Sequence, residues 1–206
     1  EIDGELRRLE SQLELGREVP LHLIIESTGA VHRAWEMLEV PRVEAAALGI
    51  IDMVASCQGA LRPEVARSPG QFEHPIAIWA KSEFSAACMS TGTVATHGVT
   101  LDLSDGARSG EDAKLARDRY GFGRQISVHP KQITPIVDAF APDDEEVTHA
   151  GEVLLAAQAL DWGPLQHRGQ FEDRATYRSY WMLLKRAHSR GMKLSPEVAA
   201  LFFDGN

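Results

Sequence analysis

The sequence predicts an α/β protein in which a parallel sheet or barrel is followed by a helical end. Two observations support this fold class. Over residues 1–141, short apolar runs of strand length alternate with stretches of helical periodicity, which is the pattern of parallel βαβ units. From Asp143 onward only helical patterns remain. We therefore expect a partial β/α unit over residues 1–141 and a helical extension over residues 142–206 that acts as a lid or oligomerisation element.

The first elements follow one another as helix, strand, helix and strand. Apolar residues recur at helical spacing over residues 2–13 and stop before Gly16, which predicts an amphipathic helix. The apolar run at 21–25 predicts a buried strand, and residues 31–38 carry a second helical pattern. The next apolar run, residues 45–51, predicts another buried strand that ends at Asp52.

The middle of the chain continues this alternation. Residues 76–91 fit either a strand followed by a helix or a single helix, and we favour the single helix because charged side chains would interrupt a long buried strand. Residues 98–102 predict a third strand, and residues 111–120 predict its following helix. A fourth strand is expected over residues 125–129.

The predicted extension contains three helices. Helical patterns cover residues 147–157 and 177–184, and a loop marked by glycine and proline separates them at residues 163–169. Ser195 is followed by Pro196, the arrangement of an N-cap residue and a first helical position. A last short helix is therefore expected as far as Phe203.

Composition excludes several classes of partner. The 206 residues contain 30 acidic and 21 basic side chains, which gives a formal net charge of −9. This charge repels a phosphate backbone and an anionic bilayer, so neither nucleic acid nor membrane is expected as a partner. The longest apolar run is too short to span a bilayer. The two cysteines lack metal-type spacing, and we expect a reducing, cytoplasmic location.

Two carboxylates are the first candidates for chemistry. Glu26 and Asp52 each follow a predicted buried strand, and active sites of parallel barrels are built where such strands end. Carboxylate oxygens suit Mg²⁺, which takes one or two protein carboxylates and fills its other positions with water and substrate oxygens. The alternative is that each acid caps the next helix or pairs with a basic side chain.

Three segments together resemble a known family. They are LIIEST around Glu26, LGIID ending at Asp52, and GFGRQISVHPKQI at residues 121–133. In this order and spacing they resemble the citrate lyase β-subunit and malyl-CoA or citramalyl-CoA lyase family of the HpcH/HpaI aldolase superfamily. The resemblance covers roughly residues 1–160 and continues more loosely through residues 171–174 to the end of the chain.

The resemblance implies a fold and an activity. The fold is a TIM-type (β/α)8 barrel of which mainly the last four strands are present here, in a homo-oligomer, a trimer or hexamer. The implied enzyme is a Mg²⁺-dependent carbon-carbon lyase that cleaves a short 3-hydroxyacyl-CoA, of the citramalyl-CoA, malyl-CoA or citryl-CoA type, to acetyl-CoA and an oxo acid. The alternatives are a divalent-metal pyruvate aldolase on free hydroxy-oxo acids and a non-catalytic barrel subunit.

The resemblance also implies roles for individual residues. Glu26 and Asp52 would hold Mg²⁺. Asp173 matches the acid that protonates the enolate of acetyl-CoA, although the local sequence departs from the commoner family pattern and a surface ion pair with Arg174 or Arg178 is the alternative. The residues expected to contact substrate or CoA are Ser27, Thr28, Asp102, Arg124, His129 and Gln132. For His129 a structural hydrogen bond, and for Arg124 plain solvation, are the alternative interpretations.

Overall fold

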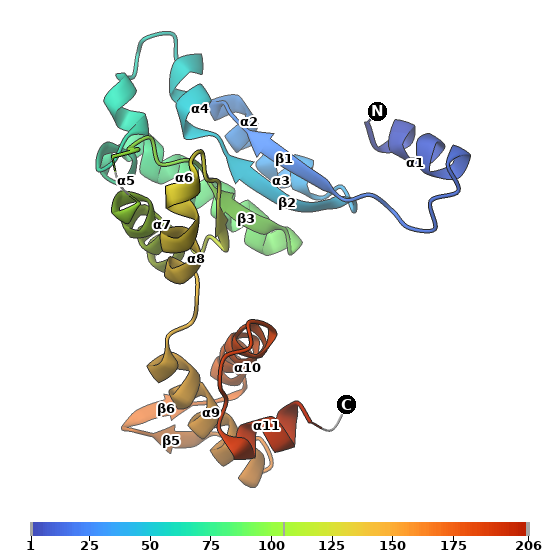
Figure 1. Ribbon diagram of the computed structural model, residues 1–206, viewed down its shortest axis with the longest axis vertical. Helices are drawn as coiled ribbons and strands as arrows, with labels where there is room; N and C mark the ends of the chain where they lie inside the picture. The colour runs from blue at the N-terminus through green and yellow to red at the C-terminus, as the bar shows by residue number, and fades with distance from the viewer. Residues whose placement is uncertain (1, 105, 205–206) are drawn as a thin grey trace. The chain divides into compact units, whose positions relative to one another are not determined.

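The computed structural model describes residues 2–104 and 106–204 and divides the chain into two compact units (Figure 1). The first unit covers residues 1–140 and the second residues 141–206. The first contains a four-stranded sheet with helices, and the second contains helices around a two-stranded hairpin. Each unit buries its own apolar cluster, so each is described separately.

The sheet of the first unit is parallel throughout, and its strands lie side by side in chain order. They are β1 (Leu21–Ile25), β2 (Val43–Leu48), β3 (Val94–His97) and β4 (Arg124–Gln125). Ile25 pairs with Leu48, and His97 pairs with Gln125, so the carboxyl ends of all four strands reach one edge of the sheet. The loops that leave this edge position the candidate site.

Helices fill the connections between the strands. Helix α1 (Ile2–Gln12) precedes β1, and α2 (Thr28–His32) and α3 (Ala34–Leu38) lead to β2. The connection to β3 contains α4 (Ile50–Ser56), η1 (Pro63–Ala66), α5 (Gly70–Glu73) and α6 (Pro75–Thr91). Helix α7 (Ala107–Tyr120) leads to β4, which η2 (Pro130–Gln132) and α8 (Ile133–Ala139) follow.

Helix α6 is the main packing partner of the sheet. Ala77, Ala80 and Phe84 on this helix are fully buried, and Ala46 of β2 is buried in the same cluster. Small side chains on both elements allow the helix backbone to approach the strands closely. Phe84 also stacks on Phe122, which lies just before β4. The helix therefore joins the middle of the sheet to its last strand.

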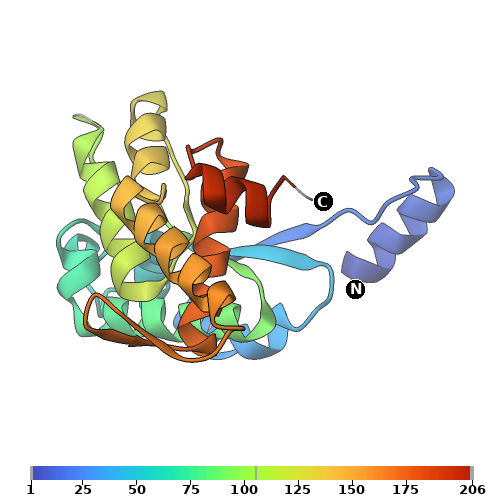
Figure 2. The ribbon, with the colours of Figure 1, turned by 90° about the horizontal axis from the view of Figure 1, so that it is seen from below.

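A buried arginine attaches α1 to the sheet. The Arg42 side chain is fully buried directly before β2, and its Nε lies 2.6 Å from Asp3 Oδ1. Its Nη1 lies 2.5 Å from Glu10 Oε1 and donates to the carbonyl oxygen of Val19 at 2.8 Å. These bonds hold α1 beyond the amino-terminal ends of β1 and β2 (Figure 2). A buried arginine needs such partners because an unpaired buried charge is strongly unfavourable.

The second unit is a helix, a hairpin and two further helices. Its elements are α9 (Asp144–Ala159), β5 (Leu165–His167), β6 (Gln170–Glu172), α10 (Arg174–Ser189) and α11 (Pro196–Phe202). Asp143 caps α9 in a capping box with Glu146, and Ser195 caps α11 by accepting from the Val198 N–H. The predicted last helix is thereby confirmed, including its cap.

Three sequence-based predictions about the fold are wrong. The third strand lies at residues 94–97 and not at 98–102, and the fourth ends at Gln125 and not at His129. The extension is not purely helical, because the expected loop at 163–169 contains most of the β5–β6 hairpin. The third strand was misplaced because Thr96 and His97 are polar but buried, whereas Leu101 is 40% exposed.

Within residues 2–104 and 106–204, no helix combines the length and the apolar character needed to span a bilayer.

Candidate metal and substrate site

Glu26 lies at the carboxyl edge of the sheet, directly after β1. The N–H of Gly49, the residue after β2, donates to the carbonyl oxygen of Ile25 at 2.9 Å, so the two strand ends are adjacent. A Cβ atom at Gly49 would lie 2.6 Å from Glu26 Cγ and 2.9 Å from Oε1. The Glu26 side chain therefore rests on the Gly49 backbone in a space that any larger residue would fill.

Asp52 does not end a strand, contrary to the sequence-based prediction. Strand β2 ends at Leu48, and Gly49 is the N-cap of α4, so Asp52 lies in the first turn of that helix with an exposed side chain. The apolar residues Ile50 and Ile51 continue the hydropathy of the strand although they belong to the helix. Both carboxylates nevertheless follow neighbouring parallel strands at the same edge of the sheet.

Ser27 and Thr28 continue directly from Glu26 into helix α2. The Ser27 Oγ accepts a hydrogen bond from the Ala30 N–H at 3.1 Å and so caps the helix. Thr28 is the first residue of α2 and is half-buried. The cap fixes the direction in which the chain leaves Glu26, and this places both hydroxyl groups next to the candidate metal ligand in the sequence.

Asp102 and Gln132 organise the loops beyond the sheet. Asp102 lies five residues after the end of β3, not at a strand end as expected. Its carboxylate accepts from the Ser104 Oγ at 2.6 Å and the Ser104 N–H at 2.9 Å, and these bonds lower the pKa of Asp102. Buried Gln132 donates from Nε2 to the carbonyl oxygens of Thr100 and Asp102 and accepts from the Val128 N–H. Its amide therefore ties two loops together.

His129 and Arg124 occupy different settings. His129 lies four residues beyond the end of β4, which corrects its expected position at a strand end, and its Nδ1 accepts from the Lys131 N–H at 3.1 Å. It therefore caps η2. Arg124 begins β4, and its Nη2 lies 3.7 Å from Glu44 Oε1 in an exposed pair. Such an exposed pair contributes little to stability.

Asp173 is the N-cap residue of α10. Its Oδ1 accepts from the Ala175 N–H at 2.8 Å, and its own N–H donates to Thr176 Oγ1 at 3.1 Å. Among the ion pairs of residues 2–104 and 106–204, none joins Asp173 to Arg174 or Arg178. The carboxylate acts as a helix cap, and within the described residues the alternative interpretation, a surface pair with Arg174 or Arg178, is not found.

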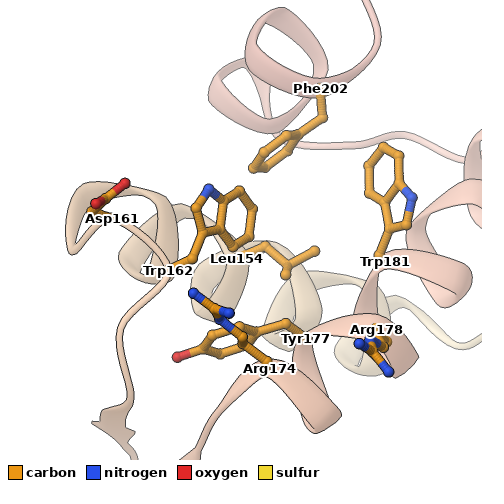
Figure 3. A pocket seen from close by; sticks show the side chains of 8 residues that line it. All are labelled: Leu154, Asp161, Trp162, Arg174, Tyr177, Arg178, Trp181 and Phe202. Carbon is orange, nitrogen blue, oxygen red and sulfur yellow. The ribbon is translucent and has the colours of Figure 1, made fainter.

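A cavity of about 620 Å³ lies beside the start of α10 (Figure 3). Four of its eight lining residues are aromatic, and Trp181 meets Phe202 edge-on at a ring-centroid distance of 5.9 Å. Two arginines, one leucine and one aspartate complete the lining. The lining residues are Leu154, Asp161, Trp162, Arg174, Tyr177, Arg178, Trp181 and Phe202.

A buried polar network in the first unit escaped the sequence analysis. Lys81 is fully buried in α6, and its Nζ lies 3.0 Å from His97 Nε2 and 3.2 Å from Gln71 Oε1. Burial lowers the pKa of Lys81 to about 7 and holds the pKa of His97 well below its usual value. The available signal was a lysine on the apolar side of a predicted helix, one turn from Ala77.

Asp112 completes this network. Its carboxylate accepts from the Ser68 Oγ at 2.6 Å, the Thr100 Oγ1 at 2.7 Å and the Gln71 Nε2 at 3.4 Å. Burial raises the pKa of Asp112, although the hydrogen bonds from Ser68 and Thr100 oppose the shift. Ser68 and Thr100 also line a pocket of about 390 Å³ with Arg67 and Arg108. The network therefore extends from the core to the loop that follows β3.

The comparisons with known proteins agree with this fold. No family model matches the chain. A citrate lyase from Burkholderia xenovorans LB400 is 42% identical with a TM-score of 0.86, and the match covers 95% of this chain and 61% of that chain. The CitE protein of Mycobacterium tuberculosis, solved with magnesium, acetoacetate and coenzyme A, is 25% identical with a TM-score of 0.69 and coverages of 85% and 63%.

Curated relatives point the same way. The L-malyl-CoA/β-methylmalyl-CoA lyase of Rhodobacter capsulatus is 26% identical over 199 residues, which is 90% of this chain and 62% of that protein. The citrate lyase β subunit of Escherichia coli K12 is 29% identical over 200 residues. The chain spans about 62% of the length of these relatives.

Fold and similarity together define an α/β protein of the class formed by citrate lyase β structures. The chain is similar to proteins named citrate lyase, citrate lyase β subunit and malyl-CoA lyase, which matches the HpcH/HpaI family. The resemblance seen in three sequence segments is thereby confirmed.

Proposed function

We propose that this chain supplies the metal-binding part of a Mg²⁺-dependent carbon-carbon lyase that cleaves a short 3-hydroxyacyl-CoA to acetyl-CoA and an oxo acid. One observation carries the proposal: Glu26 rests on Gly49 at the carboxyl edge of the sheet, and Asp52 lies in the helix turn that follows Gly49. In parallel β/α barrels this edge is where active sites are built. We infer that the four strands are half of such a barrel.

The two carboxylates fit a hard divalent cation. Within residues 2–104 and 106–204, neither Glu26 nor Asp52 forms an ion pair or a side-chain hydrogen bond, and both are exposed. Their oxygens are therefore available as ligands. Mg²⁺ takes one or two carboxylates and keeps several positions for water and substrate oxygens. When bound, Mg²⁺ would supply Lewis-acid polarisation and orientation of the substrate.

Asp173 is proposed as the acid that delivers a proton to the acetyl carbon released by C–C cleavage. The α10 cap uses Asp173 Oδ1, and the capping-box bond to Thr176 holds the residue in a fixed backbone conformation. This cap orients the carboxyl group through one of its two oxygens, and the proton that it delivers would be carried on the carboxyl group before C–C cleavage. We propose that Asp173 reaches the metal site of a neighbouring subunit in a homo-oligomer, as the family resemblance implies.

The remaining contacts divide into two groups. We propose Ser27, Thr28, Arg124 and His129 as contacts for the acyl-CoA substrate. Asp102 and Gln132 are proposed to act indirectly, because their side chains are already bound to Ser104 and to loop carbonyl oxygens. The substrate class rests on the relatives, which are named malyl-CoA, β-methylmalyl-CoA and citrate lyases.

Metal binding is tested without turnover. Mn²⁺, a paramagnetic substitute for Mg²⁺, is titrated into the metal-free chain and the free ion is measured by electron paramagnetic resonance. The wild-type chain is expected to bind Mn²⁺, and Glu26→Gln and Asp52→Asn are each expected to weaken binding at least tenfold because one anionic ligand is lost. Glu44→Gln, which alters an exposed carboxylate on β2, is the matched control. Unchanged binding in both site variants refutes the assignment.

Turnover is measured separately as release of acetyl-CoA from malyl-CoA, citramalyl-CoA and citryl-CoA, with and without EDTA. EDTA-sensitive release supports the lyase. Cleavage restricted to free hydroxy-oxo acids supports the pyruvate aldolase instead, and metal binding without any turnover supports a non-catalytic subunit. The Glu26→Gln and Asp52→Asn variants are expected to lose release in parallel with their loss of Mn²⁺ binding.

A further inference from the structure

The second unit brings three potential metal ligands together at the contact between α9 and the hairpin. His149 and Glu152 lie on α9, and His167 lies at the end of β5. One ligand atom from each of the three side chains lies within 4.8 Å of the other two, and all three residues are half-buried. This is the only such group of histidine, cysteine or acidic side chains among residues 2–104 and 106–204.

We propose that His149, Glu152 and His167 form a binding site for a divalent transition-metal ion of the Zn²⁺ type. This site is independent of the lyase assignment. Two imidazole nitrogens and one carboxylate are a recurrent zinc ligand set in which the fourth position is left to water or another ligand. The same set discriminates against Mg²⁺ and Ca²⁺, which prefer oxygen ligands only.

Local structure positions the three ligands for this role. His149 and Glu152 are three residues apart on α9, so their side chains leave the same face of the helix. The hairpin turns through Arg168 and Gly169, both with positive φ, and His167 pairs with Gln170 across the turn. A two-residue turn of this kind fixes the register of the hairpin and so the place of His167.

The present contacts show how close the groups already are. His167 Nε2 lies 3.0 Å from Glu152 Oε2, and the two imidazole rings are 5.3 Å apart between centroids. Arg168 Nη2 donates to the same Glu152 oxygen at 2.8 Å. Small side-chain rotations would bring the ligands to metal distances of about 2.0–2.2 Å. The arginine would then neutralise part of the carboxylate charge from outside.

A second, independent observation points to a cation at this place. Tyr180 OH lies 3.3 Å from His149 Nε2 and donates to Glu172 Oε1 at 3.1 Å. Glu172 is only 3% exposed, and its Oε2 has no hydrogen-bond partner. An unsatisfied buried carboxylate oxygen is costly. A dication next to His149 would offset that cost, and the Glu172–Tyr180–His149 chain would orient the imidazole as outer partners of metal ligands do.

The test uses the metal-free chain, titrated with Zn²⁺ by calorimetry and with Co²⁺ by visible absorption. The expected result is one ion per chain with the intense bands of low-coordinate Co²⁺ and an increase in melting temperature. His149→Ala and His167→Ala should each abolish the bands. His32→Ala, at an exposed histidine of α2, should leave them unchanged. Tyr180→Phe should weaken binding about tenfold, as loss of an outer partner does.

Two further measurements make the result decisive. The Glu26→Gln, Asp52→Asn double variant should still bind Zn²⁺, which separates this site from the proposed Mg²⁺ ligands. If that double variant loses the ion, or if His149→Ala and His167→Ala bind as the wild type does, the proposal is overturned. Far-UV circular dichroism of each variant confirms folding, and His167→Gln replaces His167→Ala if the alanine variant unfolds.

Discussion

The two units of the chain place their ionisable side chains in opposite ways. The first unit buries Lys81, His97 and Asp112 under the sheet and leaves Glu26 and Asp52 at an exposed edge. The second unit keeps His149, Glu152 and His167 half-buried at a helix–hairpin contact. The largest pKa shifts therefore belong to buried groups of the first unit, whereas the groups proposed to bind metals are exposed or half-buried. In this protein a shifted pKa therefore does not by itself identify a binding site.

The buried network of the first unit is best understood as a structural device. Lys81 replaces its lost hydration with Gln71, His97 and the face of Phe72, whose ring centroid lies 4.9 Å from Nζ. Asp112 is held by two hydroxyl groups and an amide. Polar groups matched in this way fix one arrangement of α5, α6 and α7, because any other packing would leave them unpaired.

The largest expected effect comes from breaking this network at its acid. Asp112→Ala removes the acceptor for the half-buried Ser68 hydroxyl, the buried Thr100 hydroxyl and the buried Gln71 amide. We expect the free energy of unfolding to fall by roughly 3 kcal/mol or more, measured by urea denaturation. Asp118→Ala, at an exposed carboxylate of the same helix that pairs with Arg117, is the control. Equal losses of unfolding free energy in the two variants would show that the buried network stabilises the fold no more than an exposed ion pair does.

The next prediction concerns pH. The pKa of Lys81 is about 7 in the folded chain, below the roughly 10.4 of an unfolded lysine. Between these values the unfolded chain holds a proton that the folded chain lacks, so stability rises with pH, by up to about 1.4 kcal/mol per pH unit. Below pH 7 Lys81 is protonated in both the folded and the unfolded chain, so the full cost of burying its charge lowers the free energy of unfolding. The pKa of His97 is shifted far below 7 and adds nothing in this window.

Lys81→Met tests this prediction, because methionine keeps the volume and has no charge. Its lost hydrogen bonds shift stability equally at all pH values, whereas the rise between pH 7 and 9, below the range in which the buried Cys88 thiol adds an opposite slope, should disappear. Urea denaturation across that range measures the slope. Lys114→Met, at an exposed lysine of α7, should retain the wild-type slope. A Lys81→Met curve parallel to the wild type would show that Lys81 keeps its proton in the folded chain.

A smaller effect is expected in the second unit, at Asp173. Asp173→Ala removes the cap of α10 and should cost about 1 kcal/mol, whereas Asp173→Asn keeps the cap and should cost only a few tenths. Thermal melting measures this difference. If Asp173 is also the acid, both variants should lose acetyl-CoA release to the same extent, because asparagine cannot donate that proton. Normal release by Asp173→Asn would leave Asp173 as a cap alone.

The sequence predicts the parts of this fold that depend on local patterns. The strand at 21–25, the single helix at 76–91 and the Ser195 cap are confirmed because period, length and capping chemistry agree there. The strand at 94–97 was missed because two of its four residues, Thr96 and His97, are polar and are nevertheless buried by tertiary contacts. Those contacts come from residues such as Lys81, which are distant in the sequence.

The candidate site was likewise predicted where local sequence patterns decide the structure and missed where tertiary contacts decide it. The sequence places Glu26 correctly after β1, but it assigns Asp52 to a strand because hydropathy continues through Ile50 and Ile51 into α4. The strand ends before Gly49, which is the N-cap of α4 and lies close to the Glu26 side chain. The hydropathy pattern does not reveal this tertiary contact. The cluster of His149, Glu152 and His167 was not predicted either, because a hairpin joins its members and the hairpin was expected to be a loop.

The smallest expected effect on stability is at Arg124, where one variant tests whether the exposed guanidinium group is only solvated or binds substrate. The Arg124–Glu44 pair is exposed on both sides at 3.7 Å, so Arg124→Ala should change the free energy of unfolding by less than about 0.5 kcal/mol. If Arg124 meets a CoA phosphate, the same variant should raise the KM for the acyl-CoA several-fold while kcat stays near normal, and Arg124→Lys should restore part of the loss. An unchanged KM would place Arg124 among the solvated charges of the first unit, because neither the fold nor the substrate would then depend on it.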